Sequence, residues 1–167
     1  MARKVLIVAM LFALVGLMAF DVAPPREYTP VLLSREDLSR SVFNQAPQEY
    51  SSPGKIYVYN SLILIVDKYK GVHVINNSVP ATPVKMGFIH IPGCMDVAVK
   101  EGVLFADNAV DLVSVDIRTY PEITVLDRVL NTFPEPTPPG MSYIPSEYSR
   151  WNRPRNTVIV GWEKINN

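Results

Sequence analysis

An internal repeat of about forty residues limits the possible folds of this chain more than any other feature. Asp67 and Asp107 are forty residues apart, as are Asn76 and Asp116. The other matched pairs are Val72 with Leu112, Ile75 with Val115, Ile56 with Val97, Pro80 with Pro121, and Val84 with Val125. A repeat of this length is typical of a supersecondary unit that buries its apolar surface against the next copy.

Each copy contains four short runs rich in β-branched residues and bounded by turn residues. The runs are residues 55–59, 62–66, 72–76 and 84–91 in the first copy, and 95–99, 103–107, 112–116 and 123–130 in the second. They predict an all-β fold with two four-stranded antiparallel sheets over residues 54–133. Runs such as LILIV at 62–66 are apolar on both faces, which favours stacked sheets like the blades of a β-propeller.

The repeat also resembles a known family. VHVIN at 72–76 with NSVPATP at 77–83, and LVSVD at 112–116 with IRTYP at 117–121, are similar to the repeat of bacterial LVIVD repeat-containing proteins. The resemblance covers about residues 50–133. It implies propeller-like blades and, for many members, export or a lipid anchor, but no defined reaction.

The chain departs from that family in two respects. It lacks a lipid-attachment cysteine after its N-terminal apolar run, and it has two repeats where a closed propeller needs ~4–8. Three hypotheses remain open: a truncated propeller, a larger ring formed by homo-oligomers or by edge pairing with further blades, and a packing of two sheets.

The N-terminus predicts export. Arg3 and Lys4 precede sixteen uncharged residues at 5–20, as in a signal peptide with a hydrophobic helix. No small-x-small cleavage site follows, so residues 1–20 are interpreted as either a cleaved signal or a retained membrane anchor. The expected location is the periplasm, the outer membrane or the cell surface.

Two less regular segments flank the repeats. Residues 21–53 are interpreted as a linker with one short helix of about ten residues, because Ser34 can cap a turn that contains Glu36 and Asp37. Residues 134–167 are interpreted as a proline-rich loop followed by a strand at 157–161.

The proline-rich loop supplies the candidate binding residues. They are the aromatic and arginine side chains of Tyr143, Tyr148, Arg150, Trp151 and Arg153, types that commonly anchor binding surfaces. The alternative is that the loop wraps a sheet and buries these aromatics.

Charge and motifs exclude several functions. The formal net charge is zero, and residues 21–167 carry 14 Lys and Arg against 16 Asp and Glu, so no basic field favours nucleic acid. No phosphate loop, His-x-x-x-His pair or Gly-x-Ser-x-Gly motif occurs, and we predict no cofactor, metal or catalytic residue.

Asp107 and Asp116 are interpreted as backbone caps, with calcium binding as the alternative. Cys94 is interpreted as a small structural residue, with a nucleophile as the alternative.

These observations predict a non-enzymatic interaction module of the cell envelope that binds a protein or a polysaccharide. The alternative is a fragment of a larger β-propeller enzyme or binding protein whose active site lies in missing blades.

Overall fold

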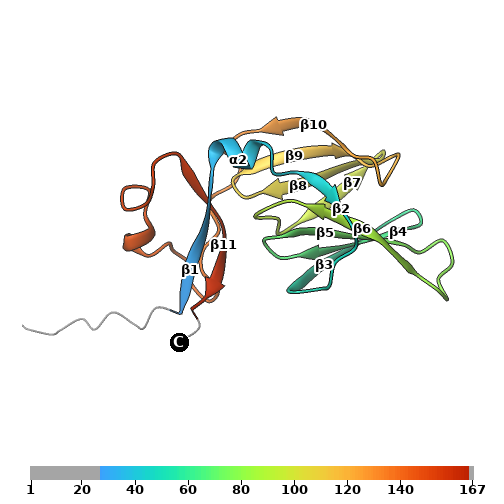
Figure 1. Ribbon diagram of the computed structural model, residues 1–167, viewed down its shortest axis with the longest axis horizontal. Helices are drawn as coiled ribbons and strands as arrows, with labels where there is room; N and C mark the ends of the chain where they lie inside the picture. Colours follow the sequence, from blue (N-terminus) through green and yellow to red (C-terminus); the bar gives the residue numbers. More distant parts are fainter. Residues whose placement is uncertain (1–26, 166–167) are drawn as a thin grey trace, which may run out of the picture.

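A computed structural model describes residues 27–165, and the regular structure in this part of the chain is mostly β-strands in antiparallel sheets (Figure 1). It forms three sheets, with five, four and two strands, and none of them closes on itself. The all-β prediction is therefore confirmed. The predicted N-terminal hydrophobic helix at residues 1–20 lies outside the described residues.

The first repeat forms the five-stranded sheet, whose order is β2-β6-β5-β4-β3. Its strands are β2 (Phe43–Gln45), β3 (Pro53–Tyr59), β4 (Leu62–Asp67), β5 (Gly71–Asn76) and β6 (Val84–His90). The sequence predicted four strands, which was wrong by one. The additional strand, β2, has only three residues and pairs with β6, so its short, mixed sequence carried no periodic signal.

The second repeat forms the four-stranded sheet, in the predicted number of strands and in the order β10-β9-β8-β7. Its strands are β7 (Val97–Lys100), β8 (Val103–Asn108), β9 (Asp111–Asp116) and β10 (Thr124–Val129). Strands adjacent in the sequence are adjacent in both sheets, apart from β2.

The turn geometry fixes which positions of the two repeats correspond. Asn60 and Glu101 begin the first hairpin turn of each repeat with similar positive φ values, 51° and 53°, and they are forty-one residues apart. The turn after β4, residues 68–70, is one residue longer than the turn after β8, residues 109–110. The repeat distance is therefore forty-one residues through the first two strands and forty in the third.

This correspondence corrects one predicted pair. Asp67 pairs with Gly71 at the end of β4, and its counterpart is Asn108, which pairs with Asp111 at the end of β8. Asp107 is one position away, and in a strand a shift of one residue reverses the direction of the side chain.

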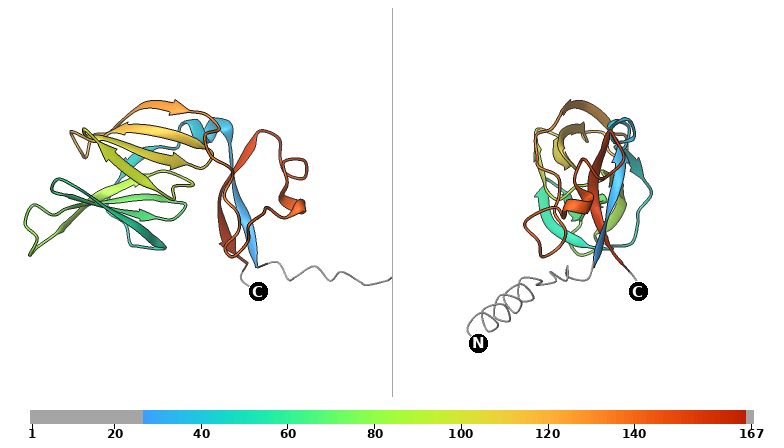
Figure 2. Two further views of the ribbon diagram at one scale, coloured as in Figure 1. Left: turned by 180° about the vertical axis from the view of Figure 1, so that it is seen from behind. Right: turned by 90° about the vertical axis from the view of Figure 1, so that its left-hand side faces the viewer.

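The two sheets pack against one another through a single apolar core (Figure 2). The first sheet contributes Leu64 and Val74, which are cross-strand partners. The second contributes Leu104 and Val115, also partners, and Leu104 corresponds to Ile63, which lies on the other face of the first sheet. The sheets therefore stack head to tail: opposite faces of the repeat meet in the core.

The third sheet joins the two ends of the described chain. Strand β1 (Tyr28–Ser34) pairs with β11 (Thr157–Lys164), and beside them lies helix α2 (Arg35–Ser39). A second apolar cluster unites Leu38 of the helix with Val158 and Val160 of β11 and with Val110 of the β8–β9 turn. This cluster attaches the small sheet to the second repeat.

Helix α2 confirms the predicted cap but not the predicted length. The Ser34 side chain accepts the backbone N–H of Asp37 at 3.0 Å. The helix has five residues where about ten were expected, because the chain turns at Arg40 and residues 43–45 join the sheet edge. No helix within residues 27–165 is long and apolar enough to cross a membrane.

Candidate functional site

Part of the outer face of the first sheet, on strands β3 and β4, is an apolar surface open to solvent. On β3, Ile56 is 63% exposed and Val58 is 64% exposed. Their counterparts in the second repeat, Val97 and Val99, are only 2% and 7% exposed because the first sheet covers them. Corresponding positions are thus buried in one repeat and open in the other.

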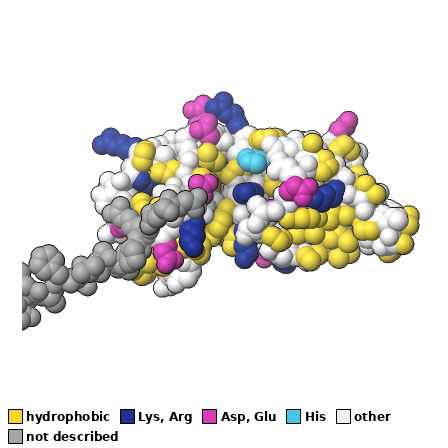
Figure 3. All heavy atoms as spheres, turned by 60° about the horizontal axis from the view of Figure 1, so that its bottom comes forward, with side chains coloured by type: hydrophobic (Ala, Val, Ile, Leu, Met, Phe, Trp, Pro, Cys, Tyr) yellow, Lys and Arg dark blue, Asp and Glu magenta, His cyan; other side chains and the backbone are white. Residues whose placement is uncertain are grey.

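The open surface continues from β3 onto β4 in two rows of cross-strand neighbours. Ile56 lies beside Ile65, and Val58 lies beside Ile63. It ends there, because the next neighbours on β5, His73 and Ile75, are buried. Figure 3 shows hydrophobic side chains gathered over the underside of the molecule, where this sheet comes forward. We call these residues (Ile56, Val58, Ile63 and Ile65) the open sheet face.

The proline-rich loop is held firmly to β11. Glu135 pairs with Arg153, and both side chains are almost fully buried. The indole N–H of Trp162 donates to the Pro136 carbonyl oxygen at 2.9 Å, and the Tyr148 ring packs edge-on against Trp162 with centroids 5.6 Å apart. The loop is therefore an ordered surface despite its lack of regular structure.

The five predicted binding residues fall into two groups. Trp151 is 94% exposed, and Tyr143 and Arg150 are also exposed, so these three side chains are accessible to a partner. Tyr148 and Arg153 anchor the loop from within. The structure thus combines the two alternatives that the sequence allows, since part of the loop wraps a sheet and part faces solvent.

A cleft of about 270 Å³ brings Arg150 and Arg153 together with Arg35. Arg35 belongs to helix α2, more than a hundred residues away in the sequence, and it was not predicted as a site residue. No sequence signal placed it there, because its position depends on the pairing of β1 with β11. We call this the arginine cleft.

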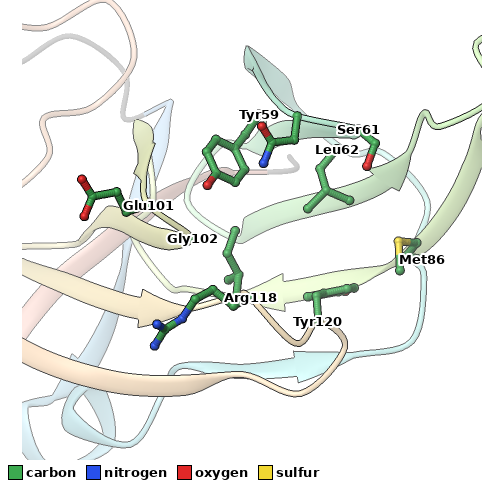
Figure 4. A pocket seen from close by; sticks show the side chains of 10 residues that line it. Tyr59, Ser61, Leu62, Met86, Glu101, Gly102, Arg118 and Tyr120 are labelled. Atoms are coloured by element: carbon green, nitrogen blue, oxygen red, sulfur yellow. The ribbon is translucent and has the colours of Figure 1, made fainter.

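A second cleft, of about 430 Å³, opens between the two sheets at their hairpin turns (Figure 4). Tyr59 and Leu62 line it from the first repeat, and Arg118 and Tyr120 line it from the second. Burial raises the pKa of Tyr120 to about 12, so its phenol stays protonated, and its hydroxyl donates to Asn44 Oδ1 at 2.8 Å. Arg118 is paired with Asp116. Neither Tyr120 nor Arg118 can therefore act as a base in this cleft.

The aspartates of the second repeat bind backbone groups. Asp116 Oδ1 accepts the N–H of Arg118 at 2.9 Å, and Asn76 Oδ1 accepts the N–H of Ser78 at 2.8 Å in the corresponding turn. Asp107 accepts the N–H groups of Met95 and Asp96. The predicted capping role of Asp107 and Asp116 is confirmed. Among the described residues, no three His, Cys, Asp or Glu side chains are grouped as a metal ion would require.

Asp67 and His73 form a buried polar cluster beside the open sheet face, on the same side of the sheet. Asp67 accepts the N–H and hydroxyl of Ser51 and the N–H of Ser52, and His73 Nε2 lies 3.1 Å from its Oδ2. Burial alone would raise the pKa of Asp67, but these hydrogen bonds outweigh it and lower the pKa to about 2. Ser51 contacts the carboxylate and not the imidazole, so the geometry differs from a nucleophilic triad.

Cys94 belongs to the apolar core between the sheets and is fully buried. Burial raises the pKa of its thiol well above the usual range, as does the nearby Asp107 carboxylate. Because the thiolate is the nucleophile, this side chain is suited to packing and not to covalent chemistry.

Comparison with protein-family models, curated proteins and solved structures finds no match. The resemblance to LVIVD repeat-containing proteins therefore rests on the repeat motif alone.

Proposed function

We propose that this protein is a non-enzymatic interaction module of the cell envelope that uses the open sheet face to bind a partner protein. The observation that supports this most directly is the contrast between the repeats: Ile56 and Val58 are exposed where Val97 and Val99 are covered by a neighbouring sheet. A partner that supplies an apolar β-surface would cover the open face in the same manner.

The physical case rests on apolar area and on position. Burying a Val or Ile side chain is worth about 1.5–3 kcal/mol, so two exposed and two half-buried side chains provide a substantial driving force for association. Strand β3 is also an edge of its sheet, and its unpaired backbone groups can extend pairing to another strand.

The envelope location is part of the proposal and comes from residues 1–20, whose basic and apolar pattern resembles an export signal. A protein partner is the first expectation for an apolar sheet face. A polysaccharide is the expectation for the loop that carries Trp151.

Replacing both Ile56 and Val58 with threonine tests the proposal. Threonine keeps the β-branched shape that suits a strand, so the fold should persist while the apolar surface is lost. In a sedimentation assay with isolated envelope membranes, we expect the double variant to bind at least tenfold more weakly than the unaltered full chain. Val84→Thr, an equally exposed valine away from this face, should bind as the unaltered protein does. Equal binding by all three proteins would contradict the proposal.

The second candidate is a part of a larger β-propeller related to LVIVD repeat proteins, in which a further blade covers the open face. The head-to-tail stacking of the two sheets supports it, because successive blades of a propeller meet through opposite faces. Genomic sequence on both sides of the codons for Met1 and Asn167 provides the test. Further repeats of about forty residues in the same reading frame would favour this candidate, and stop signals without them would exclude it.

A further inference from the structure

We propose that the arginine cleft binds a carboxylate group carried by an acidic sugar polymer. The cleft lies where helix α2, the chain after β10 and the proline-rich loop meet. Arg35, Arg150 and Arg153 line it, together with Asn131, Pro154, Asn156, Thr157 and Val158. The proposal concerns a different surface from the open sheet face and does not depend on it.

Of the three guanidinium groups, that of Arg153 has only part of its hydrogen-bonding capacity used, and that of Arg150 is not neutralised in the part of the chain that the structure describes. Arg153 pairs with Glu135 through Nη2, while its Nη1 is buried and has no hydrogen-bond partner among the described residues. Arg150 makes no ion pair within residues 27–165. Arg150 therefore has donors open to an anion from solvent, and Arg153 has one N–H group that no described residue satisfies.

The third arginine, Arg35, is paired with a carboxylate, but a further arginine pairs with the same carboxylate. Arg35 Nη1 lies 3.0 Å from Asp111 Oδ1, and its Nη2 donates to Asn131 at 2.8 Å. Asp111 also pairs with Arg128 at 3.1 Å. Four arginines around the cleft thus face two carboxylates, Asp111 and Glu135, and this leaves a local excess of positive charge in a chain whose formal net charge is zero.

A buried N–H without a partner is costly, and one on a cation more so. An incoming carboxylate would satisfy Arg153 Nη1 and gain the short, strong hydrogen bonds typical of arginine and carboxylate. The cleft volume of about 270 Å³ is slightly below the range for whole small-molecule ligands, roughly 300–1,000 Å³. The expected occupant is therefore one charged group of a larger molecule.

The neighbouring tryptophan favours a sugar polymer over an acidic peptide. Trp151 follows Arg150 directly and is 94% exposed, so its flat ring is open to contact from solvent. The C–H face of a sugar ring can stack on such a surface, while a carboxylate on the same or the next sugar reaches the arginines. A peptide anchor would instead require a pocket, which an almost fully exposed indole does not provide.

Titration calorimetry with oligogalacturonate provides the experiment, using the full chain and three single variants. Arg150→Gln should weaken binding about tenfold or more, as expected for a lost charge-assisted hydrogen bond. Trp151→Ala should weaken it by a similar factor. Arg155→Gln removes the same charge from an exposed arginine of the same loop outside the cleft, and should change the affinity less than twofold. All four proteins should melt at similar temperatures, because the altered side chains are exposed.

The alternatives give different results. Equal weakening by Arg150→Gln and Arg155→Gln would show nonspecific attraction and overturn the cleft as the site. Binding of neutral dextran as tight as that of oligogalacturonate would overturn the carboxylate requirement. Tighter binding of poly-glutamate, still sensitive to Arg150→Gln, would identify an acidic peptide as the occupant and overturn the sugar assignment. An absence of oligogalacturonate binding at low salt would refute the proposal.

Discussion

Replacing Gly71 with alanine should destabilise the protein by at least about 4 kcal/mol, an exceptional effect for one methyl group. Gly71 begins β5 with φ of +146°, a conformation that residues with a side chain rarely adopt. A Cβ at this position would overlap the carbonyl oxygen of Ile89 and lie 2.9 Å from the nitrogen of Ile91. Both atoms belong to the backbone on the β6 side of the sheet, so neither can move without breaking the pairing of β5 with β6.

Gly140→Ala provides the matched control for this prediction. Gly140 also has a positive φ, +77°, but a Cβ there would meet nothing within 4 Å. The control therefore measures backbone strain alone, about 1–2 kcal/mol. Urea denaturation followed by circular dichroism gives both values. Unfolding free energies within 1 kcal/mol of each other would show that the neighbouring backbone yields more easily than the geometry indicates.

The repeat made much of the fold predictable, because each β-rich run is local and bounded by recognisable turn residues. All eight predicted runs of the repeats correspond to strands, with bounds that differ by one or two residues. The strand predicted at 157–161 is β11, which continues to Lys164. Strands β1 and β2 were not predicted, since β1 depends on a partner about 130 residues away and β2 has three residues.

The register of the repeat was harder to derive. The hairpin turn at Glu101 requires a positive φ, yet glutamate gives no sequence signal for one, so the pairing of Asp67 with Asp107 relied on their side-chain type. Asp67 and Asp107 look equivalent in the sequence, but the turn geometry makes Asn108 the counterpart of Asp67. Side chains of the same type were therefore a weaker guide to equivalent positions of the two repeats than turns of the same conformation.

The candidate site was only partly predictable for a related reason. Exposure of Trp151 and Arg150 agrees with a loop rich in proline, but the buried pairing of Arg153 with Glu135 joins positions with no periodic relation. The open sheet face was not predicted, because its sequence pattern is regular and does not distinguish exposed from buried positions. Ile56 and Val58 fit the same apolar pattern as their buried counterparts, and only the packing of the sheets separates the two sets.

The second large effect concerns Asp67, whose replacement by alanine should cost about 3 kcal/mol or more. Its carboxylate is buried and accepts two backbone N–H groups, the Ser51 hydroxyl and a contact from His73. Alanine would leave these donors without their partner, and an unsatisfied group costs about 1–3 kcal/mol where it is buried, as His73 is. The loop before β3 would detach from the end of β4. Asp67→Asn keeps an oxygen acceptor and the side-chain volume, so it should cost distinctly less than Asp67→Ala.

The same carboxylate should make stability depend on pH in acid. The folded pKa of Asp67 is about 2, below the value near 4 expected in the unfolded chain. The ionised group therefore stabilises the fold above pH 4, and this contribution, about 2 kcal/mol, is lost as the pH falls from 4 to 2. Urea denaturation of the unaltered protein and of Asp67→Asn across this range isolates the effect, because the asparagine does not titrate. The variant should lose less stability between pH 4 and pH 2 than the unaltered protein does. Identical losses would show that other carboxylates cause the acid sensitivity and that the Ser51–Asp67–His73 cluster contributes little to it.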